Sequence, residues 1–373
     1  MDFVRKLVDA SYDAVKPLVF ELTKKDPEIA HEAFRHFAQA VHRLGLERFL
    51  FDNFANNKIG AFRISNAAGF NKNGDIPLSF LKFIGFDRCV IGTVTADPWE
   101  GADRLRIKRY YETESLVNWM GLPGIGADKV AKNLEKYNQK FGIGEIPMTA
   151  SLMSTPGKQG LDALKDIRRT LRTLRDFPYI NRWESDTSCP NTHSSLGALD
   201  ARREYQTKLA AILEIINEEK IDQQVYVKVP PDLSSQDIEQ TFEILTEKKV
   251  NGIVVANTTA FYDVRYIIES PEKGGASGNA VYDKSLQVQK SFANLINRRK
   301  SNMQLIACGG IDSLARAKER TAEGMGCNEI QIYTTLIFRG PKLLRELKKC
   351  GLDIYIRQIY LKKLICWLNS KVF

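Results

Sequence analysis

Residues 225–259 read VYVKVPPDLSSQDIEQTFEILTEKKVNGIVVANTT, and this stretch holds one complete unit of the predicted fold. A short apolar run at 225–229 precedes an amphipathic helical pattern at 235–249, and a second apolar run follows at 252–257. Apolar strands joined by helices are typical of a parallel sheet that is buried on both faces. The stretch therefore predicts a β-α-β unit.

The same alternation of short apolar runs and helical patterns extends over most of the chain. The predicted strands lie at residues 62–68, 89–94, 148–153, 179–185, 225–229, 252–257, 305–308 and 329–334. The predicted helices between them lie at residues 127–141, 160–174, 203–220, 235–249, 284–299 and 313–323. Eight strands in this arrangement favour a closed (β/α)8 TIM barrel of the α/β class over an open sheet.

The first 48 residues have a different, helical pattern. Apolar side chains recur at spacings of three and four residues, and we expect Pro17 to interrupt or kink the first helix. Asp26 and Pro27 have the residue types of an N-cap and a first helical position for a second helix. The apolar faces could pack on the barrel, or part of them could meet lipid. We therefore expect an N-terminal helical segment at 1–48, a barrel at 55–350 and a tail of unknown role at 351–373.

The composition argues against several classes of protein. The 373 residues include 54 basic and 45 acidic ones, which gives a formal net charge of +9. The basic residues are not gathered in one run with interleaved aromatics, so we expect no nucleic-acid partner, whereas an anionic membrane surface or small ligand is compatible. No stretch has the ~18 uninterrupted apolar residues of a membrane span, and we expect no secretory or organellar leader. The six cysteines are scattered without a C-x-x-C, which fits a reducing compartment and no structural zinc.

In a TIM barrel the active site lies at the carboxyl ends of the strands. The residues there are small residues, amides, hydroxyls and two lysines, at 67–72, 92–95, 188–192, 228, 257–259, 309–310 and 333–334. We find no carboxylate pair and no metal-binding constellation among them. Small residues let a backbone approach a flat ring, and the glycines and hydroxyls after the last two strands suit a phosphate. This combination predicts flavin mononucleotide (FMN); a nicotinamide dinucleotide is disfavoured because no G-x-G-x-x-G follows a strand.

Three of these positions also have ordinary structural explanations. Gly309-Gly310 could form an ordinary tight turn. Taken alone, these two glycines favour a phosphate site and such a turn equally. Lys228 could lie at the surface, but its place within Val-Tyr-Val-Lys-Val-Pro favours an inward, functional side chain. Cys189 could be a small buried residue, but its place in Ser-Cys-Pro-Asn at a strand end favours a functional role.

Taken together, these motifs resemble those of the dihydroorotate dehydrogenases, in particular the membrane-associated class that uses a quinone. The resemblance extends from about residue 26 to residue 341. The ordered motifs are D-P-E-I-A-H at 26–31, A-A-G-F-N-K-N-G at 67–74, G-T-V-T at 92–95, K-V-P-P-D-L at 228–233, N-T-T at 257–259, G-G-A-S-G at 274–278 and Y-T at 333–334.

The resemblance implies oxidation of (S)-dihydroorotate to orotate in pyrimidine (UMP) biosynthesis, with FMN as cofactor and a quinone as electron acceptor. It implies that a base removes the C5 proton of the substrate while C6 gives hydride to the flavin. Cys189 matches the position of this base. Lys72 would complement the anionic substrate, and Lys228 would complement the negative charge of the reduced flavin.

The resemblance also assigns the other site residues. The flavin-binding positions are Ala67, Ala68, Gly69, Thr93, Ser151, Asp186, Lys228, Gly278, Gly310, Tyr333 and Thr334. The substrate-binding positions are Lys72, Asn118, Gly121, Leu122, Asn191, Asn257 and Thr258, and the quinone end has His31 and Arg109. No metal is implied. The expected location is peripheral, on the cytoplasmic side of a bacterial cell membrane, and the oligomeric state is left open.

The sequence also departs from the quinone-using class. Cys189 stands where that class has Ser, Ser151 and Asp186 stand where the family has Asn, and residues 193–196 differ from the family's lid. A carboxylate at position 186 would repel an anionic substrate unless it is protonated or paired with a lysine, or unless the substrate presents a donor. Two alternatives therefore stay open: an FMN oxidoreductase acting on another dihydropyrimidine or cyclic amide, and a non-catalytic flavin-binding protein of the membrane surface.

Overall fold

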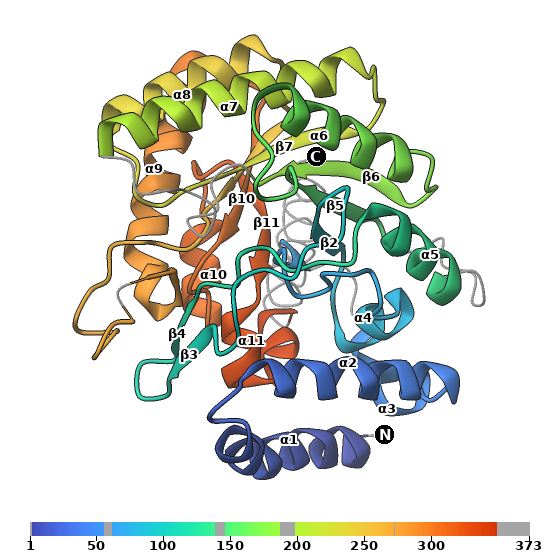
Figure 1. Cartoon of the computed structure of the whole chain (residues 1–373). Coiled ribbons are helices and arrows are strands. Elements are labelled where there is room, and N and C mark those ends of the chain that lie inside the picture. The colour runs from blue at the N-terminus through green and yellow to red at the C-terminus, as the bar shows by residue number, and fades with distance from the viewer. Residues whose placement is uncertain (1, 56–61, 139–145, 187–197, 272, 349–373) are drawn as a thin grey trace, which may run out of the picture.

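Eight parallel strands form the centre of the molecule, and helices surround them (Figure 1). The computed structural model of the chain describes residues 2–55, 62–138, 146–186, 198–271 and 273–348. The barrel strands are β1 (Arg63–Asn66), β2 (Cys89–Val94), β5 (Met148–Leu152), β6 (Ile180–Ser185), β7 (Gln224–Val229), β8 (Gly252–Val255), β10 (Gln304–Cys308) and β11 (Cys327–Ile332). They pair in the order β1-β11-β10-β8-β7-β6-β5-β2. Parallel bridges from Ser65 to Arg88 and from Asn71 to Ile91 join the two ends of this sheet, which confirms the predicted barrel.

Helices follow most of the strands on the outside of the barrel. They are α4 (Leu78–Ile84), α5 (Ala127–Asn138), α6 (Gly160–Leu174), α7 (Ala198–Glu218), α8 (Ser235–Glu247), α9 (Tyr282–Arg299), α10 (Leu314–Arg320) and α11 (Thr334–Arg339). A helix lies at each of the six predicted positions, and α6 has the predicted ends. At the start of α8, Ser234 Oγ accepts from the Asp237 N–H while the Asp237 carboxylate accepts from the Ser234 N–H. This capping box fixes where the helix begins.

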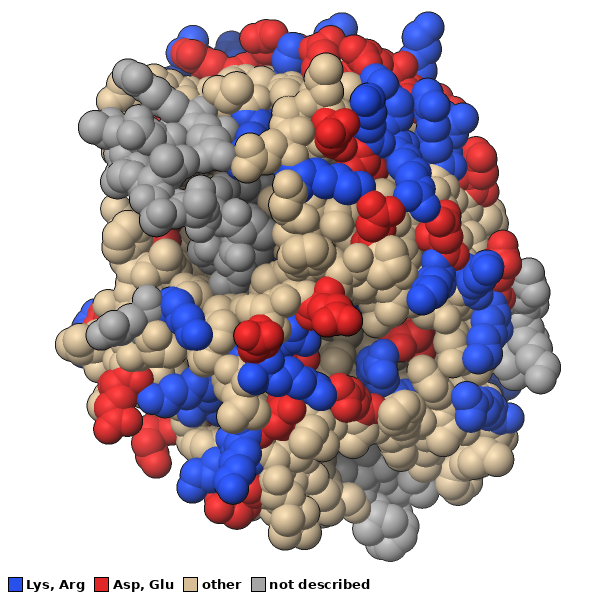
Figure 2. All heavy atoms as spheres, in the orientation of Figure 1, with Lys and Arg blue, Asp and Glu red and all other residues tan. Residues whose placement is uncertain are grey.

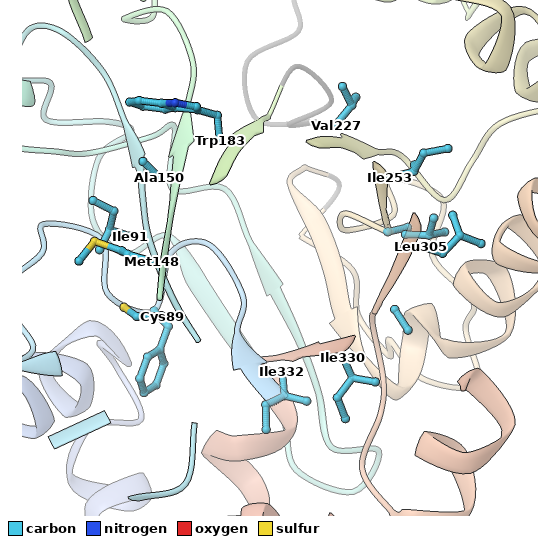
Figure 3. Packing of buried hydrophobic residues seen from close by; sticks show 14 of the residues in the cluster. Cys89, Ile91, Met148, Ala150, Trp183, Val227, Ile253, Leu305, Ile330 and Ile332 are labelled. Carbon is cyan, nitrogen blue, oxygen red and sulfur yellow. The ribbon is translucent and has the colours of Figure 1, made fainter. Parts of the chain in front are cut away.

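The main apolar core lies between the strands and the helices. On β7, Val227 and Val229 belong to this outer core, whereas Tyr226 and Lys228 lie inside the barrel. Figure 3 shows the outer side chains of successive strands, including the fully buried Trp183 of β6. Because side chains alternate along a strand, every second residue points into the barrel. These inward positions hold the polar groups of the candidate site.

A second sheet of three short antiparallel strands was not predicted. Strands β3 (Ile107–Tyr110), β4 (Ser115–Asn118) and β9 (Gly275–Gly278) pair in the order β3-β4-β9, with Asn118 opposite Gly275. Strands of four residues carry too short an alternating pattern to be recognised, and the Gly-Ala-Ser-Gly of β9 lacks the β-branched and aromatic residues that favour strands. Through this pairing, a glycine-rich segment of the predicted flavin site lies beside a predicted substrate residue.

Three N-terminal helices, α1 (Asp2–Leu22), α2 (Glu28–Arg43) and α3 (Glu47–Ala55), lie together at one end of the molecule (Figure 1). Helix α1 continues through Pro17 to its end at Leu22, so the predicted interruption is not observed. Before the proline, the Tyr12 hydroxyl donates to Ile337 O (2.6 Å), and after it the Phe20 ring packs edge-on against Phe338 at 5.9 Å. Contacts on both sides of Pro17 thus hold α1 against α11 despite the backbone hydrogen bond that proline removes.

Ion pairs fasten α2 to the segment between β2 and β3. Arg106 donates to both carboxylate oxygens of Glu28 (2.7 and 3.0 Å), and Arg104 donates to Glu32 (2.6 Å). The Asp26 carboxylate accepts from the Glu28 N–H (3.1 Å), but Pro27 and not Asp26 occupies the N-cap position of α2, one residue later than predicted. The N-terminal segment therefore packs on the barrel, which was one of the two expectations for it.

The same helices also keep large apolar side chains exposed to solvent. These are Val15, Leu18, Leu22, Ile29, Phe37, Leu44 and Phe49. Within the described parts of the chain, no helix combines the length and the hydropathy needed to cross a membrane. On the face in Figure 2, basic and acidic side chains are interspersed. Even near α6, where basic groups gather, Arg169 pairs with Asp97 and Asp128 (2.8 and 2.7 Å).

Candidate active site

Four polar side chains meet where β2, β5, β6 and β8 end. Thr93 Oγ1 lies 3.0 Å from Ser151 Oγ and donates to Asp186 Oδ2 (2.8 Å). Asn257 Nδ2 donates to Asp186 Oδ1 (2.9 Å). We call these four residues the strand-end cluster. The sequence predicted all four as site residues, and the structure brings them together because the carboxyl ends of the barrel strands share one mouth.

Asp186 is the acceptor at the centre of this cluster. It is buried, and each of its carboxylate oxygens accepts a hydrogen bond from a neutral donor. Carboxylate oxygens accept hydrogen bonds, and a hydroxyl and an amide supply the donors here. Among the described residues, Thr93 and Asn257 are therefore the hydrogen-bond partners of Asp186. The charge of Asp186 also acts on a lysine that lies deeper in the barrel.

That lysine is Lys228, which points into the barrel from β7. Its Nζ lies 3.5 Å from Oε1 of Glu184, and Gln331 Nε2 donates to the other oxygen of Glu184 (2.8 Å). Burial opposes the charge of Lys228, but the attraction of Glu184 and of Asp186 helps to raise the pKa of Lys228 above its usual value. Lys228 is thus a buried cation, and the inward orientation predicted for it is confirmed.

The glycines of β9 and of the turn after β10 lie beside the first residue of α11. A side-chain carbon added to Gly310 would lie 2.8 Å from Gly278 O, and one added to Gly278 would lie 3.0 Å from Thr334 Cγ2. Both glycines have positive φ (+76° for Gly278 and +67° for Gly310), a region that favours glycine. Ser277 Oγ lies 2.9 Å from Thr334 Oγ1. This corner of close backbone and paired hydroxyls fits the phosphate of FMN.

The end of β1 meets the end of β11 at Tyr333. The Ala67 N–H donates to Ile332 O (3.0 Å), and a side-chain carbon added to Gly69 would lie 3.4 Å from the Tyr333 ring. Tyr333 is largely enclosed, and burial, with the nearby charge of Glu28, raises the pKa of its hydroxyl to about 12. The predicted positions Ala67, Ala68 and Gly69 therefore form a small-residue wall next to an aromatic ring.

The other predicted substrate residues that the structure describes do not form one cluster but lie on several different segments. Asn118 Nδ2 donates to Gly275 O at 3.5 Å, and the Thr258 N–H donates to the Asn257 side-chain oxygen at 2.9 Å. Lys72 is half-buried, and its charge lowers the pKa of Glu28 and of His31. Gly121 and Leu122 lie in the loop after β4, where Gly121 packs against the backbone of Gly101 and Ala102. The predicted base Cys189, Asn191 and the lid at 193–196 lie outside the described residues.

The two residues predicted for the quinone end lie where the N-terminal helices meet the barrel. The His31 ring packs 5.8 Å from the Phe70 ring and 6.2 Å from the Tyr333 ring. Burial, together with the charges of Arg35 and Lys72, lowers the pKa of His31 to about 4. Arg109 donates to Thr23 Oγ1 (3.1 Å) and to Pro27 O (3.2 Å), which join α1 to α2. His31 and Tyr333 thus connect α2 with the strand ends through aromatic contacts.

Further inward charges on β6 were missed in the sequence. Arg182 and Glu184 alternate along β6 and Asp186 directly follows it; only Asp186 was predicted, because the resemblance to the family includes that position. Below Glu184, Arg182 Nη1 donates to both carboxylate oxygens of Glu329 (3.0 and 2.9 Å). Glu184 and Asp186 thus share the inner side of β6. Charged residues at every second position of a buried strand were the available signal.

Three groups of polar side chains, which we call layers, lie inside the barrel beside an apolar cluster of Ala67, Tyr226, Val254, Ile306 and Cys308. The lower layer is Arg88, Arg182 and Glu329, and the middle layer is Glu184, Lys228 and Gln331. The strand-end cluster forms the top layer. Barrel interiors are usually filled by branched apolar side chains, so these layers set this barrel apart.

Comparison with known proteins agrees with this architecture. A sequence model of the family described as dihydroorotate dehydrogenase matches residues 52–352. A dihydroorotate dehydrogenase (quinone) of Idiomarina loihiensis is 30% identical over 351 residues, covering 90% of this chain and 98% of that protein. A protein of the same name from Brucella anthropi is 32% identical over 297 residues, covering 78% of this chain and 77% of that protein.

Solved structures support the fold. The crystal structure of DHODH from Eimeria tenella in complex with ferulenol superimposes with a TM-score of 0.73 at 24% identity, covering 89% of this chain and 92% of that one. The family match spans nearly all of the barrel, and the polar strand ends carry the motifs that the resemblance required. On this evidence the chain belongs to the dihydroorotate dehydrogenase family.

Proposed function

We propose that the chain oxidises dihydroorotate to orotate with FMN as its cofactor and a quinone as electron acceptor, as a step of pyrimidine biosynthesis. Membership of the family and the quinone-class relatives support this function. The single observation that carries it to this chain is the strand-end cluster, in which Thr93, Ser151, Asp186 and Asn257 converge at the barrel mouth. When bound, FMN would supply a hydride acceptor and an electron donor for the quinone, and the corner at Gly278, Gly310 and Thr334 would hold its phosphate.

The chain's own residues would bind the substrate and remove its proton. Amides such as Asn118 and Asn257 can donate to and accept from the polar edge of a pyrimidine, and Lys72 can balance the substrate's carboxylate charge. Cys189 is the proposed base for the C5 proton. A thiol has an unperturbed pKa of ~8.5, so the site must favour the thiolate for it to accept a proton near neutral pH.

Protein donors hold the carboxylate of Asp186 in the proposed site. Its two oxygens already accept from Thr93 and Asn257, so its lone pairs are directed at protein donors. The Asn257 side-chain oxygen in turn accepts from the Thr258 N–H (2.9 Å), so the amide is held on both sides. We infer that Asp186 orients Asn257, and that the substrate meets the amide more directly than the carboxylate.

The first test is anaerobic bleaching of the bound flavin. Protein loaded with FMN should lose its yellow absorbance when dihydroorotate is added without oxygen, because the substrate reduces the cofactor. The Cys189→Ala variant should keep its FMN and lose rate by about 10²–10⁴-fold, the usual contribution of a general base. A yellow protein that dihydroorotate fails to bleach would favour the alternatives of another cyclic amide substrate or of a flavin-binding protein without turnover.

We further propose that α1 to α3 hold the protein on the cytoplasmic surface of the cell membrane and bring the quinone to the flavin. The exposed Leu18 and Leu22 on α1 and Phe49 on α3 support a contact with lipid. His31 supports a quinone path, because it is neutral at physiological pH and lies against Phe70 and Tyr333.

Sedimentation with anionic phospholipid vesicles tests this surface. The Leu18→Glu/Leu22→Glu variant should leave the vesicle pellet and still be bleached by dihydroorotate, since neither side chain lies in the barrel. Leu161→Glu is the matched control, because Leu161 on α6 is 74% exposed and Leu22 is 75% exposed. Equal sedimentation of both variants would contradict the membrane role of α1.

A further inference from the structure

We propose that Glu184 is a positioning residue that holds Lys228 and offsets its charge, and that it thereby sets how strongly the site stabilises reduced over oxidised flavin. This inference rests on the proposed function, in which Lys228 complements the negative charge of reduced FMN. It concerns a residue that no motif of the resemblance includes.

Contacts on two sides fix the position of the Glu184 carboxylate. Glu184 is completely buried on the inner face of β6, and Lys228, on the neighbouring strand β7, is 4% exposed. The Lys228 Nζ lies 3.5 Å from Glu184 Oε1, while Gln331 donates to Oε2 at 2.8 Å from the opposite side of the barrel. The carboxylate is therefore held between an ammonium and an amide, and it restricts where the Lys228 side chain can point.

Among the described residues, two carboxylates lie near the Lys228 ammonium. Glu184 and, more weakly, Asp186 both help to raise the pKa of Lys228. In an interior with few waters, charges at such distances interact far more strongly than in solvent. A negative charge fixed beside Lys228 reduces the electrostatic stabilisation that this cation gives to an anionic ligand. Glu184 should therefore oppose reduction of the flavin.

The proposal predicts a shift in the flavin's midpoint potential when this charge is removed. In Glu184→Gln, an amide of the same shape keeps an acceptor for Gln331 and loses the negative charge. We expect reduced FMN to gain at least about tenfold in affinity relative to oxidised FMN, which is a rise of about 30 mV for a two-electron couple. Potentials measured with a redox indicator dye and titration of the apoprotein with oxidised FMN give the two numbers independently of turnover.

Asp237→Asn is the matched control. Asp237 is also a buried carboxylate, but it lies in the capping box of α8 on the outside of the barrel. This variant should cost some stability and leave the midpoint potential unchanged. A potential that shifts equally in both variants would overturn the role of Glu184, because it would reflect loosening of the fold.

A second variant guards against failure of Glu184→Gln to fold. Gln331→Met removes the amide that donates to Glu184 and keeps the carboxylate's charge, so the potential should move in the opposite direction, downward. An unchanged potential in a folded, FMN-loaded variant of either kind overturns the inference. Failure of the unaltered protein to bind FMN, or to be bleached by dihydroorotate, would instead overturn the proposed function, so the two failures are distinguishable.

Discussion

The lower and middle layers of the barrel interior lie two residues apart along β6, and they bury charge in different ways. In the lower layer, Glu329 accepts from Arg182 through both oxygens and from Ser65 Oγ (2.9 Å), and the Arg182 guanidinium lies 4.2 Å from the centre of the Tyr226 ring. In the middle layer, Glu184 meets Lys228 through one contact of 3.5 Å. The lower pair is bidentate and lies deep in the barrel, where it supports the fold, whereas the middle pair lies next to the mouth, where the charge of a ligand can act on it.

Removing Glu329 should break the lower layer and produce the largest effect on stability. Glu329→Ala leaves Arg182 and Arg88 buried beside each other, and burial and the charge of Arg182 already lower the pKa of Arg88 to about 10. Breaking a buried pair by removing one partner typically costs about 3–5 kcal/mol. Urea unfolding monitored by tryptophan fluorescence measures this loss.

The same variant also tests how independent the two layers are. Folded, FMN-loaded Glu329→Ala should keep the midpoint potential of the unaltered protein, because the removed charge does not lie beside Lys228. A loss below about 1 kcal/mol, or a shifted potential, would show that the lower layer is not the support described above.

His31 extends the comparison to a buried basic group that is neutral, and not charged, in the native protein near neutral pH. Its native pKa of about 4 lies below the usual value of 6.5, so between these two pH values the unfolded chain binds a proton that the native protein does not. Stability should therefore fall as the pH drops from about 6.5 to about 4, by ~2 kcal/mol at pH 5.

Unfolding curves of His31→Leu supply the reference for this effect. That variant should show a shallower loss of stability between pH 6.5 and pH 5 than the unaltered protein. Parallel pH profiles would mean that His31 is protonated in the native state, and this would also remove the argument for a neutral quinone path.

Asp186→Asn should produce the smallest effect, at the top of the same strand. The Thr93 hydroxyl can turn to accept from the new amide, and the Asn257 amide keeps an acceptor, so the fold should hold. Removing a negative charge near an anionic substrate should lower the KM for dihydroorotate by up to about tenfold, or ~1.4 kcal/mol. Absence of turnover with FMN still bound would argue against orotate as the product.

The sequence predicted the barrel well because its strands are buried on both faces and stand out as apolar runs. The barrel rule, which directs attention to strand ends, predicted Thr93 and Asn257, whereas Ser151 and Asp186 were predicted through the resemblance to the family. The sequence could not show Glu184 and Glu329 as partners of Lys228 and Arg182, because pairing across a barrel depends on the register of strands far apart in the chain. Strand β9 was missed for a local reason, since Gly-Ala-Ser-Gly carries no strand signal.

The bond between Tyr12 and Ile337 has a consequence for the newly made chain. The two residues are 325 positions apart, so α1 cannot reach its place on α11 until almost the whole protein has been synthesised. At the usual 5–20 residues per second, α1 waits on the ribosome for roughly 15–65 s before its docking site exists. During that time the apolar side chains of α1 have no barrel to cover them, and a nearby bilayer or chaperone can reach them first. The end of the molecule that is proposed to meet the membrane is thus also the last to be completed.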